Sequence, residues 1–224
     1  MNSMKFCKEL EVSFRKETNR EMAIPMENYL KNHFAFLGIK TEKRRAIFKS
    51  IYEKNKAEVK SNFRAIASEL FQMNEREFHQ SAIDLLVKEF KKNYTLEDSK
   101  LIEKLIITNS WWDSVDVIAK YLLGGYLLQF PSVTFSVIER FSNSENMWLN
   151  RSAVLFQLSY KEKTNFEILK SACEKHKHSN EFFIQKAIGW ALRDYSRFNP
   201  NGVFEYVNAT NLKPLSKREA LRLL

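Results

Sequence analysis

The stretch Glu75–Phe90, EREFHQSAIDLLVKEF, shows most clearly how this chain folds. Its apolar residues recur at spacings of three and four, which is the period of an α-helix and not of a β-strand. A helix over this stretch would bury one side and leave charged residues on the other. The residues that predict this buried face are Phe78, Ala82, Leu85, Leu86 and Phe90.

The same helical period continues along most of the chain. Five glycines and four prolines provide few turns, and no alternating pattern indicates a strand. No Pro-, Gly- or Ser-rich linker divides the sequence, so we expect one domain over residues 1–224. Many amphipathic helices of this length are typical of a helix bundle or of a solenoid of helix pairs. Capping-box spacing predicts helix starts at Asn74/Glu77, Thr95/Asp98, Ser110/Asp113 and Ser216/Glu219.

Thirty-six Lys and Arg residues against 27 Asp and Glu residues give a net charge of +9. Such an excess suits a polyanionic partner, either nucleic acid or an anionic membrane surface. The two cysteines form no disulfide framework or metal-binding motif, which indicates a reducing compartment. No signal peptide or apolar run of about 18 residues is present. We therefore expect a cytoplasmic protein that does not enter a membrane.

Several common catalytic motifs are missing from the sequence. It has no Gly-rich phosphate loop, no GxSxG and no HExxH. His176 and His178 are two positions apart, so a helix would direct them to different sides, and we expect no metal site. The Lys43-Arg44-Arg45 cluster is interpreted as a solvated basic helix face that could also contact phosphates.

The helix expected over residues 181–195 has an unusual polar side. Lys186, Trp190, Arg193 and Arg197 share one face, opposite the buried one. One interpretation is that Trp190 packs against a neighbouring helix pair. The other is a basic, aromatic surface that meets a phosphate backbone and stacks on a sugar or base.

Two further polar residues interrupt apolar faces. Trp112 and Asp116 are four positions apart, so an indole and a carboxylate project side by side from the helix expected over residues 111–126. Asp116 could instead pair with a lysine such as Lys120, and Asp113 is interpreted as a cap partner of Ser110. Arg151 lies within an apolar face, which is costly without a partner. It forms either a buried ion pair or a bidentate contact with a phosphate.

With these residues in place, the chain resembles the DNA alkylation repair family of HEAT-like DNA glycosylases (AlkD-like), which is typified by bacterial enzymes. The matching strings cover the chain from about Met26 to the C-terminus. The N-terminal helix expected over residues 1–22 is outside them. They are MENYLKNHFAFLGIKT (26–41), SWWDSVD (110–116), NMWLNRSAVLFQL (146–158), EFFIQKAIGWALRDYSRFNP (181–200) and PLSKREA (214–220).

The resemblance implies an all-α, right-handed superhelical solenoid of HEAT-like helix pairs that holds duplex DNA on a basic surface. It implies catalytic roles beside the deoxyribose for Asp116, Trp112 and Trp190. Arg151 would hold the DNA backbone. The remaining DNA contacts would come from Tyr29 and Arg193, with Lys186 and Arg197 from the basic stripe. Lys40 stands where the family string GI-x-T is expected to carry glutamine, which would alter contacts to the strand opposite the lesion.

The activity implied is hydrolysis of the glycosidic bond of N3- or N7-alkylated purines in duplex DNA. Such a base already carries a positive charge and leaves as a neutral molecule without protonation. The sugar becomes cationic, so a carboxylate can stabilise it and orient water. No metal or other cofactor is needed, and base flipping is not required.

Two other functions remain open from the sequence. One is a DNA-binding paralogue without catalysis, and the other is a HEAT-like scaffold whose basic surface binds an acidic protein. The resemblance implies a monomer whose partner is alkylated duplex DNA.

Overall fold

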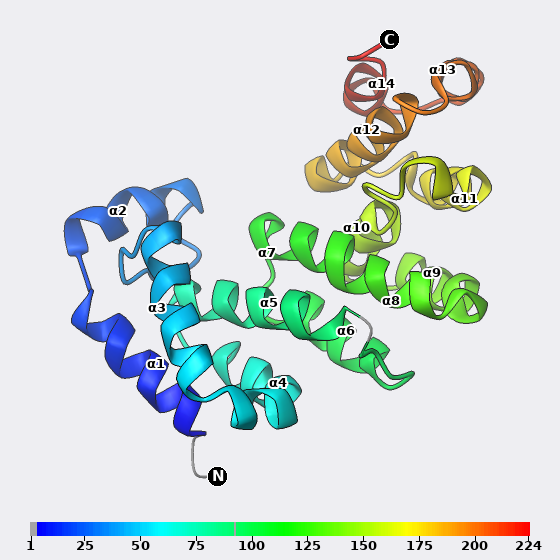
Figure 1. The fold of residues 1–224 in the computed structure, drawn as a ribbon. Helices are drawn as coiled ribbons and strands as arrows, with labels where there is room; N and C mark the ends of the chain where they lie inside the picture. The colour runs from blue at the N-terminus through cyan, green and yellow to red at the C-terminus, as the bar shows by residue number, and fades with distance from the viewer. Residues whose placement is uncertain (1–3, 92) are drawn as a thin grey trace. The chain divides into compact units, whose positions relative to one another are not determined.

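In the computed structural model, residues 4–91 and 93–224 are described, and these residues are mainly helical without a β-strand (Figure 1). Ala35 and Glu75 form an isolated bridge. The all-α fold class that the sequence predicts is therefore confirmed. Contacts divide the chain into two compact units, Met1–Asn93 and Tyr94–Leu224, which are described separately below.

The N-terminal unit is built on packed helix pairs with a phenylalanine-rich core. Its first helix packs on the third and fourth, and the fifth packs on the same two. Ring pairs hold these contacts, with centroids 5.6 Å apart for Phe6–Phe48 and 5.3 Å apart for Phe14–Phe78. The helices are α1 (Lys5–Lys16), α2 (Arg20–Tyr29), α3 (Thr41–Lys54), α4 (Lys56–Leu70) and α5 (Arg76–Phe90).

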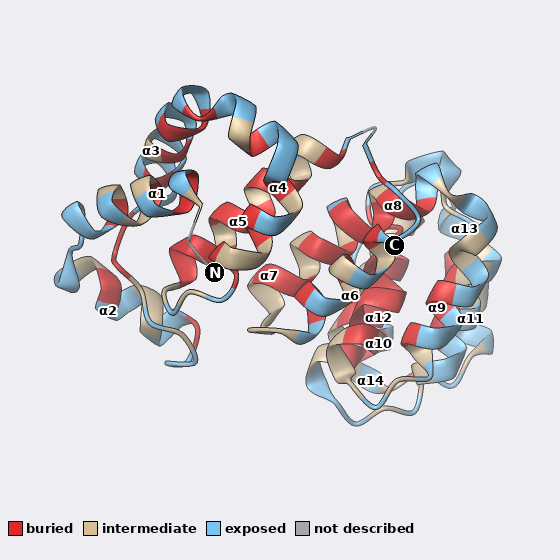
Figure 2. Cartoon of the chain, turned by 90° about the horizontal axis from the view of Figure 1, so that it is seen from below, coloured by how far each residue is buried: buried red, intermediate tan, exposed pale blue. Residues whose placement is uncertain are grey.

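Helix α5 confirms the face predicted from its sequence, because Phe78, Ala82, Leu85, Leu86 and Phe90 are all fully buried. Figure 2 shows this buried side in red. Its first turn differs from the prediction, since α5 begins at Arg76 and the N-cap is Glu75. Asn74 and Glu77 do not form the expected capping box. The Glu77 carboxylate instead accepts hydrogen bonds from the segment that precedes α3.

The cluster Lys43-Arg44-Arg45 is not a uniformly solvated face, which corrects the sequence interpretation. Arg44 is buried and donates to Ser81 at 3.1 Å and to Asp84 at 2.8 Å. Arg45 binds the same aspartate, and Lys43 pairs with Glu17. Burial lowers the pKa of Arg44, and the nearby Asp84 opposes that shift. These cations therefore stabilise the unit.

The C-terminal unit begins with helix α6 (Asp98–Ile107), and its remaining helices range from short and irregular to the 15-residue helix α12. The short 3₁₀ turns are η2 (Pro131–Val133) and η3 (Lys161–Lys163). The α-helices are α7 (Trp112–Val117), α8 (Gly124–Gln129), α9 (Thr134–Ser142), α10 (Met147–Leu155), α11 (Phe166–His176), α12 (Phe182–Ser196), α13 (Pro200–Ala209) and α14 (Pro214–Ala220).

One regular helix was expected over residues 111–126, but the structure interrupts it. A π-helical segment, η1 (Ile118–Leu123), joins α7 to α8. Such wide turns inside α-helices are frequent at functional sites. Gly124 follows at once, where a Cβ would lie 2.5 Å from the Phe156 carbonyl oxygen. The close approach of these backbones therefore requires glycine here.

The core of the C-terminal unit lies where α10, α12 and α14 meet. Helix α12 packs on α10 and on α14, and the buried residues of α10 and α12 appear red in Figure 2. On the side of α12 opposite the basic stripe, where Ile184, Ala187, Ile188, Ala191 and Tyr195 were expected to be buried, the first four are buried and Tyr195 is half-buried. The four buried residues join a cluster to which Val154 and Leu155 of α10 also belong.

The other capping boxes had mixed outcomes. The Thr95 N–H donates to Asp98 at 2.7 Å, as the sequence predicts. The Ser110 hydroxyl instead donates to the Ile106 carbonyl oxygen, and α7 begins after Trp111. The Ser216 hydroxyl donates to the Gln185 carbonyl oxygen, which joins α14 to α12.

Both cysteines are free and buried within their units. Cys7 lies in α1 and Cys173 in α11. Burial in low-dielectric surroundings raises the pKa of each thiol well above its ordinary value, and nearby glutamates add to the shift.

Candidate functional site

The carboxylate of Asp116 is held by the guanidinium of Arg151. Arg151 Nε donates to Oδ1 at 2.7 Å and Nη2 donates to Oδ2 at 2.8 Å. Asp116 comes from α7 and Arg151 from α10, and their side chains are 13% and 5% exposed. Two parallel bonds fix the plane of the carboxylate as well as its position. Of the sequence alternatives, the structure shows a buried ion pair at Arg151, and Arg151 takes the place expected for Lys120 at Asp116.

Arg151 also connects this pair to α12. Its Nη1 donates to the Phe183 carbonyl oxygen, and its guanidinium carbon lies 5.9 Å from the centre of the Phe183 ring. One buried side chain thus joins α7, α10 and the first turn of α12. Such a charge is stable in a buried position because each of its nitrogens is hydrogen-bonded.

The pKa of Asp116 is raised from its ordinary value of 3.8 because the carboxyl is buried. The hydrogen bonds and charge of Arg151 favour the ionised form and offset part of that shift. The arrangement keeps a negative charge in surroundings of low polarity, where it acts strongly on a nearby cation.

An aromatic cluster surrounds the same helix ends. Trp111, Trp148 and Phe183 form a triangle whose ring centroids are 5.2 to 5.7 Å apart. Trp111, the first apolar residue of the helix expected over residues 111–126, is only half-buried in this cluster. Trp148 was not predicted as a site residue, although it lies three residues before Arg151 in the string NMWLNRS. This spacing places both on one side of α10.

Trp112 and Asp116 occupy the same side of α7, as predicted. Both lie within the helix Trp112–Val117, one turn apart; Trp112 is half-buried, and the Asp116 side chain is largely buried. On α12, Trp190 follows Phe183 by seven residues, which is about 10 Å along the same side of a helix. Trp190 is half-buried and packs in part against the core cluster, so this packing does not decide between its two sequence interpretations.

The three cations of the basic stripe on α12 are partly neutralised by an acidic residue of α14. Lys186 and Arg193 both bind Glu219 of α14, at 3.1 and 2.6 Å. Arg193 also donates to the Glu219 carbonyl oxygen at 3.1 Å. Hydrogen bonds from Arg193 and Lys186 lower the pKa of Glu219. Arg197 is exposed at the C-cap of α12.

The two remaining predicted contacts belong to the N-terminal unit. Tyr29 ends α2 and is 71% exposed. Lys40 is exposed at the N-cap of α3. Ten residues separate the two, and the intervening segment forms no helix or strand.

Residues 4–91 and 93–224 show neither a metal-binding cluster nor a single membrane-spanning helix. No group of three or more His, Cys, Asp and Glu side chains in these ranges could hold a metal ion. Within the same ranges no single helix is long and apolar enough to cross a membrane. One pair of helices, Trp112–Gln129 and Pro131–Ser142, meets the length and composition criteria together but is bent by 109°.

Comparison with known proteins identifies the family to which this chain belongs. The sequence profile of the family described as "DNA alkylation repair enzyme" matches residues 10–224. The chain belongs to this family of DNA repair enzymes.

Solved structures agree with this assignment. A predicted DNA alkylation repair enzyme from Enterococcus faecalis is 35% identical, with a TM-score of 0.85 over 93% of this chain and 97% of that one. The protein smu.31 from Streptococcus mutans UA159 is 14% identical, with a TM-score of 0.60 over 98% of this chain and 97% of that one, and shares the fold. A comparison with curated proteins found no match.

Proposed function

We propose that this protein is a DNA glycosylase that hydrolyses the N-glycosidic bond of N3- or N7-alkylated purines in duplex DNA. The observation that carries the proposal is the buried Asp116 carboxylate, held in a fixed orientation by Arg151. A fixed negative charge of this kind stabilises positive charge that develops in a transition state.

In the proposed reaction the enzyme does not need to protonate the departing base. Alkylation gives the purine a positive charge, and breaking the C1′–N bond returns the bonding electrons to the base, which leaves neutral. The sugar becomes an oxocarbenium ion. The Asp116 carboxylate stabilises this cation and orients the water that attacks C1′; the water proton is then released.

Aromatic side chains support the same step. The indole of Trp112 lies one turn from Asp116, and Trp190 lies further along α12. The electron-rich face of an indole attracts a cation by about 0.5–2 kcal/mol. Arg151 keeps the carboxylate ionised and aligned.

Base release tests this function directly. Duplex DNA treated with a methylating agent is incubated with the protein, and the released bases are separated by chromatography. We expect 3-methyladenine or 7-methylguanine, with equal yield in the presence of EDTA. Tight binding to duplex DNA without release from any alkylated substrate would contradict the proposal and favour a DNA-binding paralogue. Binding that does not weaken linearly in the logarithm of salt concentration would favour a protein scaffold.

A further inference from the structure

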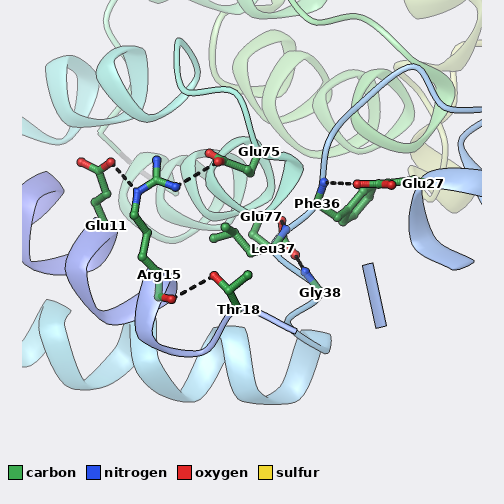
Figure 3. A network of polar contacts seen from close by, with 9 residues as sticks. All are labelled: Glu11, Arg15, Thr18, Glu27, Phe36, Leu37, Gly38, Glu75 and Glu77. Atoms are coloured by element: carbon green, nitrogen blue, oxygen red, sulfur yellow. Dashed lines mark hydrogen bonds and ion pairs between the residues drawn. The ribbon is translucent and has the colours of Figure 1, made fainter. Parts of the chain in front are cut away.

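Glu77 is a fully buried glutamate in the first turn of α5, and its carboxylate is bound by main-chain groups (Figure 3). Oε2 accepts the N–H of Leu37 at 3.0 Å. Oε1 accepts the N–H groups of Gly38 at 2.9 Å and Ile39 at 3.1 Å. Hydrogen bonds to an ionised acceptor are stronger than those between neutral groups. Three of them fix the path of three consecutive residues.

The same three residues press against the start of α2. Gly38 has φ +86°, and a Cβ there would lie 2.0 Å from the Asn19 carbonyl oxygen and 2.8 Å from the Ala23 nitrogen. The Asn19 N–H donates to the Leu37 carbonyl oxygen at 2.7 Å. Only glycine fits both this conformation and this contact. Glu77 therefore fixes the segment onto α2, the helix that ends at Tyr29.

Other contacts hold the rest of the segment between α2 and α3. Glu27 accepts the Phe36 N–H at 3.3 Å (Figure 3), and the Arg76 N–H donates to the Ala35 carbonyl oxygen at 2.9 Å. Lys31 and Asn32 have φ of 57° and 58°, in the left-handed region that asparagine tolerates but lysine rarely adopts. Strained backbone of this kind persists only where surrounding contacts determine it, and it is concentrated at functional sites.

The segment exposes cations and an aromatic ring at its surface. Tyr29, Lys31, His33 and Lys40 are all exposed. Lys43, a few residues on, forms an ion pair with Glu17. Within the described part of the chain, Lys31 and Lys40 have no such acidic partner, so their charges can meet a phosphate backbone.

We propose that Glu77 is the positioning residue of a DNA-contacting segment, Tyr29–Lys40, in the N-terminal unit. The inference rests on the proposed function, because it takes duplex DNA as the ligand. A segment that is ordered before binding loses little conformational entropy when DNA binds, so fixing it increases affinity. Glu77 itself does not touch DNA, and it acts through Lys40 and Tyr29.

The test compares Glu77→Gln with a matched control, Glu75→Gln. Glutamine keeps one acceptor oxygen but turns an NH₂ group toward main-chain N–H donors. The control Glu75→Gln removes the same charge two residues earlier in the chain. The Glu75 side chain binds Arg15 and makes no hydrogen bond to the segment between α2 and α3. We expect Glu77→Gln to weaken the Kd for duplex DNA about 5- to 20-fold. The single-turnover rate at saturating enzyme should stay within about twofold, and Glu75→Gln should bind like wild type.

A double-mutant cycle separates positioning from general stability. Lys40→Ala should cost less affinity in the Glu77→Gln background than in wild type, because the segment that presents Lys40 is already loosened. Glu27→Gln, which weakens the contact to Phe36 and also the ion pair with Arg20, should weaken Kd about two- to threefold, and Arg20→Gln, which removes the ion pair alone, should not; this pair tests the positioning of the segment if Glu77→Gln fails to fold. Far-UV circular dichroism monitors folding in each case.

The outcomes distinguish this inference from the proposed function. An unchanged Kd in folded Glu77→Gln, additive effects in the cycle, or equal losses in Kd and saturated rate would overturn the positioning role. If wild type binds duplex DNA without releasing a base, the proposed glycosylase function fails and the Kd comparison still decides the inference. A wild type that binds no duplex DNA contradicts both.

Discussion

Gly189 of α12 lies directly beneath Glu219 of α14. A Cβ on Gly189 would be 2.4 Å from the Glu219 Cβ and 3.0 Å from the Ser216 carbonyl oxygen. The two helices therefore approach as closely as backbone atoms allow. The approach brings the Glu219 carboxylate between Lys186 and Arg193, one on each side of this contact.

Gly189→Ala should consequently destabilise the protein. Alanine favours a helix over glycine by about 1 kcal/mol, but the clash with α14 should outweigh this gain. We expect a net loss of about 1–3 kcal/mol in the free energy of unfolding, as is typical of overpacked sites. Urea denaturation followed by circular dichroism measures it. Equal or higher stability would show that the helices can separate without cost.

Asp116→Asn should lower the single-turnover rate of base release about 10²- to 10³-fold, the cost of removing one electrostatic contact to a transition state. The change also leaves Arg151 without its anion, so stability should fall by about 3–5 kcal/mol. Rates are measured below the unfolding temperature of the variant. Asp113→Asn, which removes a carboxylate from the same helix, is the control and should stay within about threefold of wild type. Undiminished excision by Asp116→Asn would refute the catalytic role.

The rate should depend on pH through Asp116. The carboxylate must be ionised to stabilise the sugar, so the rate rises with pH and levels off above its pKa. Because burial raises that pKa, the acid limb should have its midpoint above the ordinary value of 3.8. Arg151→Lys should move the midpoint upward, and Lys120→Ala should leave it in place. Rates are corrected for acid depurination of DNA without enzyme. A midpoint at or below 3.8 would contradict the burial argument.

Glu219→Gln should strengthen the salt dependence of DNA binding. Glu219 neutralises charge on Lys186 and Arg193, and its removal leaves a further cation to meet phosphate. We expect the slope of log Kd against log salt to steepen by about 0.9. Fluorescence anisotropy over a salt series measures the slope. Glu205→Gln, an exposed position on α13, should leave the slope unchanged, and equal slopes for both variants would show that the stripe does not meet DNA.

The helical period predicts the buried face correctly for a helix that packs against its neighbours through a single side. In α5 all the predicted core residues are buried, and in α12 all but the half-buried Tyr195 are. The same reasoning places Trp112 beside Asp116, because both lie on one regular helix. It did not predict the π-helical segment Ile118–Leu123, which ends beside Gly124, where that glycine approaches the Phe156 carbonyl of another part of the chain.

Side-chain partners from distant parts of the sequence were harder to predict. The period shows that Arg151 is buried and needs an anion, but the choice of Asp116 depends on how α7 packs against α10. Lys186 and Arg193 look free along α12 because Glu219 lies 26 or more residues away. Glu77 has the spacing of a capping residue, but its carboxylate accepts hydrogen bonds from the main-chain N–H groups of residues 37–39 instead of capping its own helix. In each case tertiary contact overrides the local pattern.

The protected thiols have a practical consequence. Nucleophilic attack on an electrophile requires the thiolate, and burial keeps Cys7 and Cys173 protonated and covered. Reagents that alkylate purines should therefore leave both side chains intact in the folded protein. A cysteine introduced at an exposed position, as in Lys31→Cys, should then be the site that maleimide dyes label. Cys7 and Cys173 would not have to be replaced first.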